Sequence, residues 1–140
     1  MGRDPAPEVR RLAGEPGVMV TGGVPDVRPF LGAAAAAVCP LKIARGIQNK
    51  VLEAMAMGVP VVATPIATRA FGKDCPGIVE AANAEKTIGE VARLLADPDL
   101  AAKIGGFGRD EALRNFSWRA SVDKLELVYE EAIRDHGRMT

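Results

Sequence analysis

Residues 49–64 join a helical segment directly to a short, mostly apolar run, and few folds accommodate that combination. Asn49 can cap a helix that runs through Met57, and Gly58 is well placed to end it. The run 59–64 is apolar without alternation, which is typical of a strand buried on both faces. A parallel sheet between helices buries its strands in this way, so the residues predict an α/β fold.

Shorter runs extend this pattern in both directions along the chain. Residues 18–21 and 35–39 predict two strands before the helical segment. Residues 64–77 carry two prolines and two glycines, which predicts a loop. Ile78 and Val79 then form a brief edge strand. The expected sheet therefore receives most of its strands from the first 80 residues.

Helical patterns dominate the last third of the chain. Residues 84–96 form one amphipathic segment, and Asp97 followed by Pro98 has the signature of a cap and a first helical residue. Three glycines in that next helix are expected to weaken it, namely Gly105, Gly106 and Gly108. Ser117 can cap a last helix that runs to about residue 133. Its apolar face consists of Val122, Leu125, Tyr129 and Ile133.

A chain of 140 residues is long enough for one domain with a core and too short for two ordinary ones. We therefore expect a single domain over residues 1–133 and a flexible tail over residues 134–140. The tail holds the only histidine, His136. One histidine near the end of the chain cannot supply the base of a nucleophilic triad, so that class of enzyme is excluded.

Charge and composition exclude further classes of function. Eighteen Lys and Arg balance eighteen Asp and Glu, so no broad positive field is available to bind nucleic acid. Cys39 and Cys75 lie in no metal-ligand spacing, and no zinc site is expected. No stretch has the apolar length of a signal peptide or a membrane span. We expect a cytoplasmic protein, and peripheral attachment to the inner membrane stays open for the full-length protein.

The segment 45–53 carries the candidate chemistry. A strand, a glycine-containing loop and then a helix place free backbone N–H groups at the carboxyl edge of a parallel sheet, where anions bind. A nucleotide diphosphate suits such a place. Lys50 opposes the dipole of the first helical turn unless an anion lies in front of it, and Glu53 can accept two hydroxyl hydrogen bonds. The candidate binding residues are Glu53, Gly46, Ile47, Lys50, Arg45, Asn49 and Gly22.

Each candidate also has a plain structural interpretation. Glu53 can merely complement the helix dipole, Arg45 can be a solvated loop arginine and Gly46 a turn glycine. Gly22 follows a predicted strand, but the residues after it do not complete a GxGxxG motif, so a turn is favoured over a contact with the nucleotide base. Lys42 is a further phosphate candidate that can equally face solvent. These alternatives stay open at the level of the residues alone.

A specific match is the sequence Leu-Glu-Ala-Met-Ala-Met-Gly-Val-Pro-Val-Val at residues 52–62. It resembles the donor-site signature of GT-B glycosyltransferases of family 4. The resemblance extends to residues 18–31 and, through Phe116-Ser117-Trp118 and Tyr129, to the C-terminal helix. Residues 25–31 and 44–50 together are similar to the sugar transferases associated with the PEP-CTERM and exosortase export system.

The resemblance implies a Rossmann-like doubly wound parallel sheet, the C-terminal half of a GT-B fold, followed by C-terminal helices. It implies that Glu53 holds the ribose of a nucleotide diphosphate sugar. It further implies retaining transfer of the sugar to a cell-surface polysaccharide or glycolipid acceptor, as in exopolysaccharide biosynthesis, with no cofactor and no metal ion. One residue departs from the family pattern. Arg45 stands where the family commonly has a first Glu, and a cation can bind diphosphate but cannot accept bonds from sugar hydroxyls.

The resemblance also implies a partner domain. In the family, an acceptor-binding domain and a first βα unit with diphosphate-binding cations precede this segment, and the chain is expected to be a fragment that lacks them and has no turnover alone. The surface left open favours self-association. The competing interpretation is a non-enzymatic doubly wound binding module, such as a receiver-like domain. That module would need clustered acidic residues at strand ends, and Asp26 stands alone there.

Overall fold

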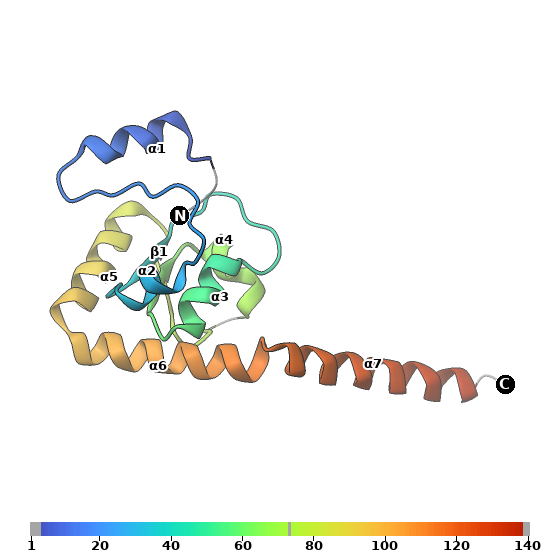
Figure 1. Cartoon of the computed structure of the whole chain (residues 1–140). Coiled ribbons are helices and arrows are strands. Elements are labelled where there is room, and N and C mark those ends of the chain that lie inside the picture. Colours follow the sequence, from blue (N-terminus) through green and yellow to red (C-terminus); the bar gives the residue numbers. More distant parts are fainter. Residues whose placement is uncertain (1–3, 73, 139–140) are drawn as a thin grey trace. The chain divides into compact units, whose positions relative to one another are not determined.

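The computed structural model describes residues 4–72 and 74–138 (Figure 1). The chain divides into two compact units, Met1–Ala33 and Ala34–Thr140. The first unit contains two short helices, α1 (Pro7–Arg11) and α2 (Arg28–Gly32), and a 3₁₀ turn, η1 (Leu12–Gly14). The second unit contains the sheet and the longer helices.

The strand predicted at residues 18–21 is wrong, because the structure has no strand there. The Val18 amide donates to the Glu15 carbonyl at 3.1 Å, which is the bond of a turn. All three strands of the described chain lie beyond residue 36, and none of them pairs with this run. A β-branched run without a neighbouring strand has no ladder to complete its backbone hydrogen bonds, and it therefore stays irregular.

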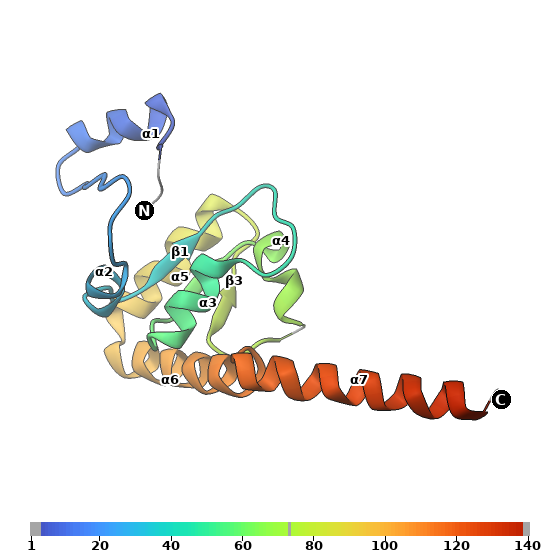
Figure 2. The same cartoon turned by 45° about the vertical axis from the view of Figure 1, so that its right-hand side comes forward.

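The sheet has three parallel strands in the order β1–β2–β3. They are β1 (Ala37–Cys39), β2 (Val61–Ala63) and β3 (Ile78–Glu80), and the register places Val38 beside Val62 and Val62 beside Val79. Figure 2 shows β1 and β3 with α3 and α5 close to the sheet. The structure thus confirms a parallel α/β arrangement, and it confirms the edge position of β3.

The central strand β2 is buried along its whole length. Successive residues of a strand point to opposite faces, so its continuous burial means that both faces are covered. Val62 packs with Ala81, with Leu94 of α5 and with Ala101 of α6. The continuous apolar run predicted this burial correctly, and the sheet core lies around Val62.

The helix α3 (Asn49–Ala56) connects β1 to β2 and ends as predicted. Gly58 has φ of 73°, a left-handed conformation that glycine adopts without strain. Its amide donates to the Met55 carbonyl at 2.8 Å, and the Val59 amide donates to the Ala54 carbonyl at 3.0 Å. This pair of bonds is a Schellman motif, and it sends the chain directly from α3 into β2.

The loop predicted between β2 and β3 contains a short helix instead. The structure has α4 (Pro65–Thr68) followed by the 3₁₀ turn η2 (Arg69–Phe71). Pro65 lies at the first turn of α4, where its missing N–H is tolerated. The proline that indicated a loop is therefore compatible with the start of a helix.

The three C-terminal helices are α5 (Ala84–Ala96), α6 (Pro98–Asn115) and α7 (Trp118–Arg138). Asp97 caps α6 as predicted, accepting the Leu100 amide at 2.9 Å. The Ser117 hydroxyl accepts the Ala120 amide at 3.2 Å at the start of α7. The helix α7 continues to residue 138, beyond the expected end near 133.

The glycines that were expected to weaken α6 do not interrupt it, and their effect on the stability of the helix stays a prediction. The helix runs unbroken through Gly105, Gly106 and Gly108, because two of the glycines allow close packing. A Cβ at position 105 would overlap the carbonyl group of Gly58, and one at position 108 would lie 3.0 Å from the Cα of Gly77. Close backbone contact with the end of α3 and the start of β3 thus replaces side-chain packing.

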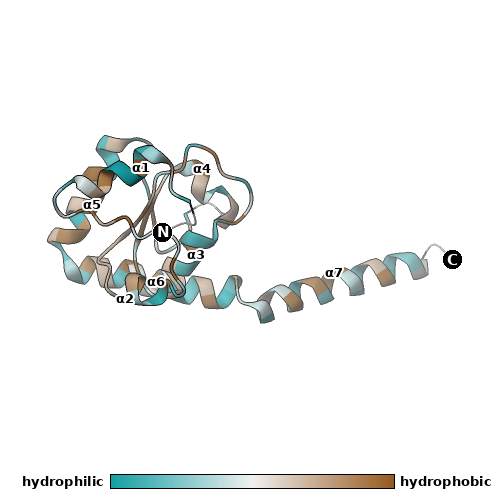
Figure 3. Cartoon of the chain, turned by 45° about the horizontal axis from the view of Figure 1, so that its top comes forward, coloured by the Kyte–Doolittle hydropathy of each residue, from teal (hydrophilic) through white to brown (hydrophobic). Residues whose placement is uncertain are grey.

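The helix α7 leaves its apolar face open. The predicted face residues are between 49% and 71% exposed, and the apolar positions continue along the helix in Figure 3. They are Val122, Leu125, Tyr129 and Ile133. In the described part of the chain, no helix is both long and apolar enough to cross a membrane.

Candidate functional site

The start of α3 lies next to the carboxyl end of β1, one loop away. Gln48 occupies the N-cap with extended backbone, and the Val51 and Leu52 amides donate to its carbonyl at 2.9 and 3.1 Å. The prediction that Asn49 caps α3 is therefore wrong, because Asn49 is the first helical residue. Asn49 remains exposed at the first turn, where backbone amides have no partner within the helix. This end of α3 can present N–H donors to an anion.

Gly46 shapes the loop before α3. Its φ of 61° lies in the left-handed region, and a Cβ there would meet nothing within 4 Å. The glycine is required by backbone conformation rather than by lack of space. The turn interpretation of Gly46 is thus supported, and it agrees with a loop that exposes Arg45 and Ile47 on either side.

The charged candidates are exposed and carry no ion pair within the described residues. Arg45, Lys50 and Glu53 all face solvent, and no described salt bridge includes them. Burial raises the pKa of the Cys39 thiol at the end of β1, and the positive charge of Lys50 partly offsets that shift. The ammonium group of Lys50 is therefore close enough to the carboxyl end of β1 to interact electrostatically with groups there.

Gln48 is a residue whose role at this site the sequence reasoning missed. Its side-chain amide donates to the Arg45 carbonyl at 3.0 Å and to the Gly46 carbonyl at 3.2 Å. These bonds join the Gln48 side chain at the start of α3 to the backbone of the loop just before it. A polar residue between a glycine and a helix is a common pattern, so the spacing alone gave little signal for this role.

Gly22 belongs to the first unit, Met1–Ala33. Its φ of 64° confirms a turn conformation. It lines a hollow of about 460 Å³ together with Met19, Val20 and Phe30. Residues 45–53 form one continuous segment of the second unit, whereas Gly22 is part of the first.

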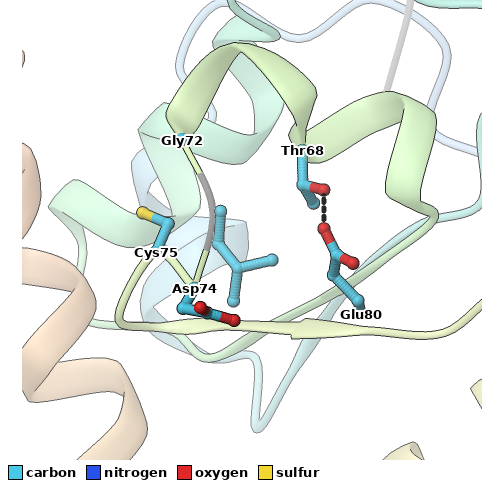
Figure 4. Close-up of a pocket in the computed structure, with 6 residues that line it drawn as sticks. Thr68, Gly72, Asp74, Cys75 and Glu80 are labelled. Carbon is cyan, nitrogen blue, oxygen red and sulfur yellow. Dashed lines mark hydrogen bonds between the residues drawn. The ribbon is translucent and has the colours of Figure 1, made fainter.

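A second hollow, of about 160 Å³, lies between α4 and β3 (Figure 4). The Thr68 hydroxyl donates to the Glu80 carboxylate across it. Burial, with a smaller contribution from the Glu111 carboxylate, raises the pKa of Cys75 to about 11. That thiol is protonated at neutral pH and is a poor nucleophile. The described residues contain no cluster of His, Cys, Asp and Glu placed to hold a metal ion.

Comparison with known proteins assigns the family. The family described as "Glycosyl transferases group 1" matches residues 1–97, which include all three strands, α3 and the candidate loop. The chain belongs to the group 1 glycosyl transferases. No solved structure matches this group 1 chain.

A curated relative is the MMP alpha-(1->4)-mannosyltransferase of Mycolicibacterium hassiacum. It is 31% identical to this group 1 chain over an alignment that covers 72% of the chain. The same alignment covers 26% of the relative, so the chain spans about a quarter of that protein's length. The match supports membership of a family of sugar transferases.

Proposed function

We propose that residues 45–53 bind the diphosphate and ribose of a nucleotide diphosphate sugar, as the donor site of a GT-B glycosyltransferase. The observation that supports this most strongly is a single segment within the matched family region. It joins a left-handed glycine, two exposed cations and a helix start. A doubly wound Rossmann-like domain of this kind binds its ligand beyond the carboxyl ends of parallel strands. The free start of α3 lies at that edge.

Different residues of the segment are proposed to bind different parts of the ligand. The amides at the first turn of α3 and of Ile47 donate to phosphate oxygens, and Lys50 and Arg45 neutralise their charge. Glu53, one turn further along α3, accepts hydrogen bonds from the two ribose hydroxyls. When the sugar–phosphate bond breaks, negative charge grows on the diphosphate, and these same groups stabilise it. The proposal assigns that stabilisation to the helix start and the cations, without a metal ion or cofactor.

Arg45 makes this site different from the usual pattern of the family it resembles. A guanidinium presents a rigid set of donors that suits two phosphate oxygens at once. It cannot accept bonds from sugar hydroxyls. Sugar recognition in this protein must therefore use other groups. The relative named above is a mannosyltransferase, so mannose is the first sugar to test.

The complete reaction is proposed for a larger assembly. Retaining transfer to a polysaccharide or glycolipid acceptor requires an acceptor held opposite the donor in a closed cleft. Positioning of this kind contributes about 7–11 kcal/mol to lowering a barrier. The 140 residues alone are expected to bind a nucleotide without measurable transfer, because the acceptor site is proposed to lie outside them. Membership of a transferase family favours this function over a non-enzymatic binding module.

Calorimetry on the purified chain tests the site. Glu53→Gln should weaken binding of both UDP or GDP and the corresponding nucleoside by about 1–3 kcal/mol, the range for a hydrogen bond to a charged group. Arg45→Ala should weaken binding of the diphosphate and leave the nucleoside unchanged. Glu85→Gln and Arg109→Ala are matched controls, because both side chains are exposed on other helices. Equal losses for both ligands in Arg45→Ala would contradict its phosphate role.

A further inference from the structure

A threonine outside the candidate segment holds the start of its loop. Thr64 directly follows β2, and its hydroxyl donates to the Leu41 carbonyl at 2.6 Å, across 23 residues of sequence. Its amide donates to the Cys39 carbonyl at 3.4 Å, and the Leu41 amide donates to the same carbonyl at 2.9 Å. The end of β2 is thereby joined to the point where the chain leaves β1.

The far end of the loop is held by Gln48, through the two bonds to the Arg45 and Gly46 carbonyls described above. Side-chain hydrogen bonds therefore fix both ends of residues 41–48. One bond joins the loop to the sheet, and the others join it to the start of α3.

Hydrophobic packing offers little to hold this loop between its ends. Ile43 is 83% exposed and Ile47 is 46% exposed, although both are large apolar residues. Gly46, near the far end of the loop, adds backbone freedom. A loop with few buried apolar contacts has low local stability, so its polar contacts contribute much of what restrains it. The Thr64–Leu41 bond is half-buried and the Gln48 bonds are exposed, so the first should restrain the loop more strongly.

We propose that Thr64 and Gln48 are positioning residues that fix the loop of residues 41–48, so that the amides of Gly46 and Ile47 meet the donor diphosphate in a prepared geometry. This rests on the proposed function of the segment. Neither side chain is assigned a contact with the ligand. Both act by reducing the number of loop conformations that binding must select, which raises affinity without a new contact.

The test compares two replacements of Thr64. Thr64→Val keeps the shape and removes the hydroxyl, whereas Thr64→Ser keeps the hydroxyl. The Kd for UDP or GDP should rise about three- to tenfold in Thr64→Val, the equivalent of one lost hydrogen bond. In Thr64→Ser it should return to within about twofold of the original value, because the donor is restored. Thr87→Val is the matched control, since the Thr87 hydroxyl donates to the carbonyl of Asn83, the N-cap of α5, at 2.8 Å.

The amide spectrum of the free protein separates this inference from the proposed function. Thr64→Val should shift the Gly46 and Ile47 amides without any ligand, and Thr64→Ser and Thr87→Val should not. If the unchanged protein binds neither nucleotide, the proposed function fails. The Gly46 and Ile47 amide shifts of ligand-free Thr64→Val would still show whether Thr64 fixes the loop conformation. If it binds and Thr64→Val binds equally well with unshifted amides, the positioning role is overturned. Should Thr64→Val not fold, Gln48→Met carries the same test, with an expected loss of about two- to threefold.

Discussion

The sequences of the consecutive helices α6 and α7 indicate that α7 packs better than α6, and the structure shows the reverse. The helix α6 has three glycines and a weak apolar pattern, yet it packs closely against the end of α3 and the start of β3 through Gly105 and Gly108. The helix α7 has a regular apolar face, yet that face is mostly exposed. Figure 1 shows α6 beside the sheet and α3, and α7 continuing beyond them.

Apolar periodicity and burial are therefore separate properties of a helix. Periodicity predicts that a segment forms a helix with an apolar face, but it does not say what covers that face. Small residues, in contrast, lower helix propensity while permitting a close backbone approach that larger residues prevent. In this chain the glycines mark the better-packed helix.

Of the two helices compared, α6 carries the larger expected effect, at Gly105. The variant Gly105→Ala should lower the free energy of unfolding by about 1–3 kcal/mol or more, because its methyl group overlaps the Gly58 backbone, which cannot move like a side chain. Gly106→Ala is the control: a Cβ there meets nothing within 4 Å, so it should stabilise the helix by about 0.5–1 kcal/mol. Urea denaturation measures both. If Gly105→Ala left the free energy of unfolding unchanged, that result would contradict the close packing of α6 against the Gly58 backbone.

A smaller effect should appear at alkaline pH. The pKa of Cys75 is raised from 9.0 to about 11 in the folded state, so the folded protein keeps a proton that the unfolded chain loses. The free energy of unfolding should therefore fall as the pH rises from about 9 toward 11, by on the order of 2 kcal/mol. Chemical denaturation at several pH values measures the slope. Cys75→Ala should flatten it, and an unchanged slope would contradict burial of this thiol.

The smallest effect is expected on the exposed helix. Leu125 is 53% exposed, so Leu125→Ala should change the free energy of unfolding by less than about 0.5 kcal/mol. The same replacement at Leu94, which is 1% exposed, should cost about 2–5 kcal/mol. A large loss for Leu125→Ala in thermal unfolding would mean that the α7 face is covered in solution, for example by self-association.

The elements that the sequence predicted well are those set by local patterns. The apolar run of β2, the left-handed Gly58 and the Asp97 cap each depend on residues close together in the chain. The wrong prediction at residues 18–21 and the unpredicted close packing of α6 both depend on residues distant in the sequence. A strand needs a neighbouring strand, and a glycine favours close packing only where another backbone lies opposite it.

The candidate site shows the same division. Its composition, from Arg45 to Glu53, follows from the sequence, and so does its place before α3. The cap at Gln48 and the bond from Thr64 to Leu41 did not follow, since the latter joins residues 23 positions apart through a single hydroxyl. Side-chain contacts of this kind leave no periodic pattern in a sequence.

We propose above all that a nucleotide diphosphate binds at the start of α3. Titration of the isotope-labelled chain with UDP and GDP, followed by amide chemical shifts, tests it most directly. We expect the amides of Gly46, Ile47 and Lys50 to shift in a saturable way, with those along α7 unchanged. Shifts that are absent at millimolar nucleotide, or that spare these three amides, would contradict the proposed donor site.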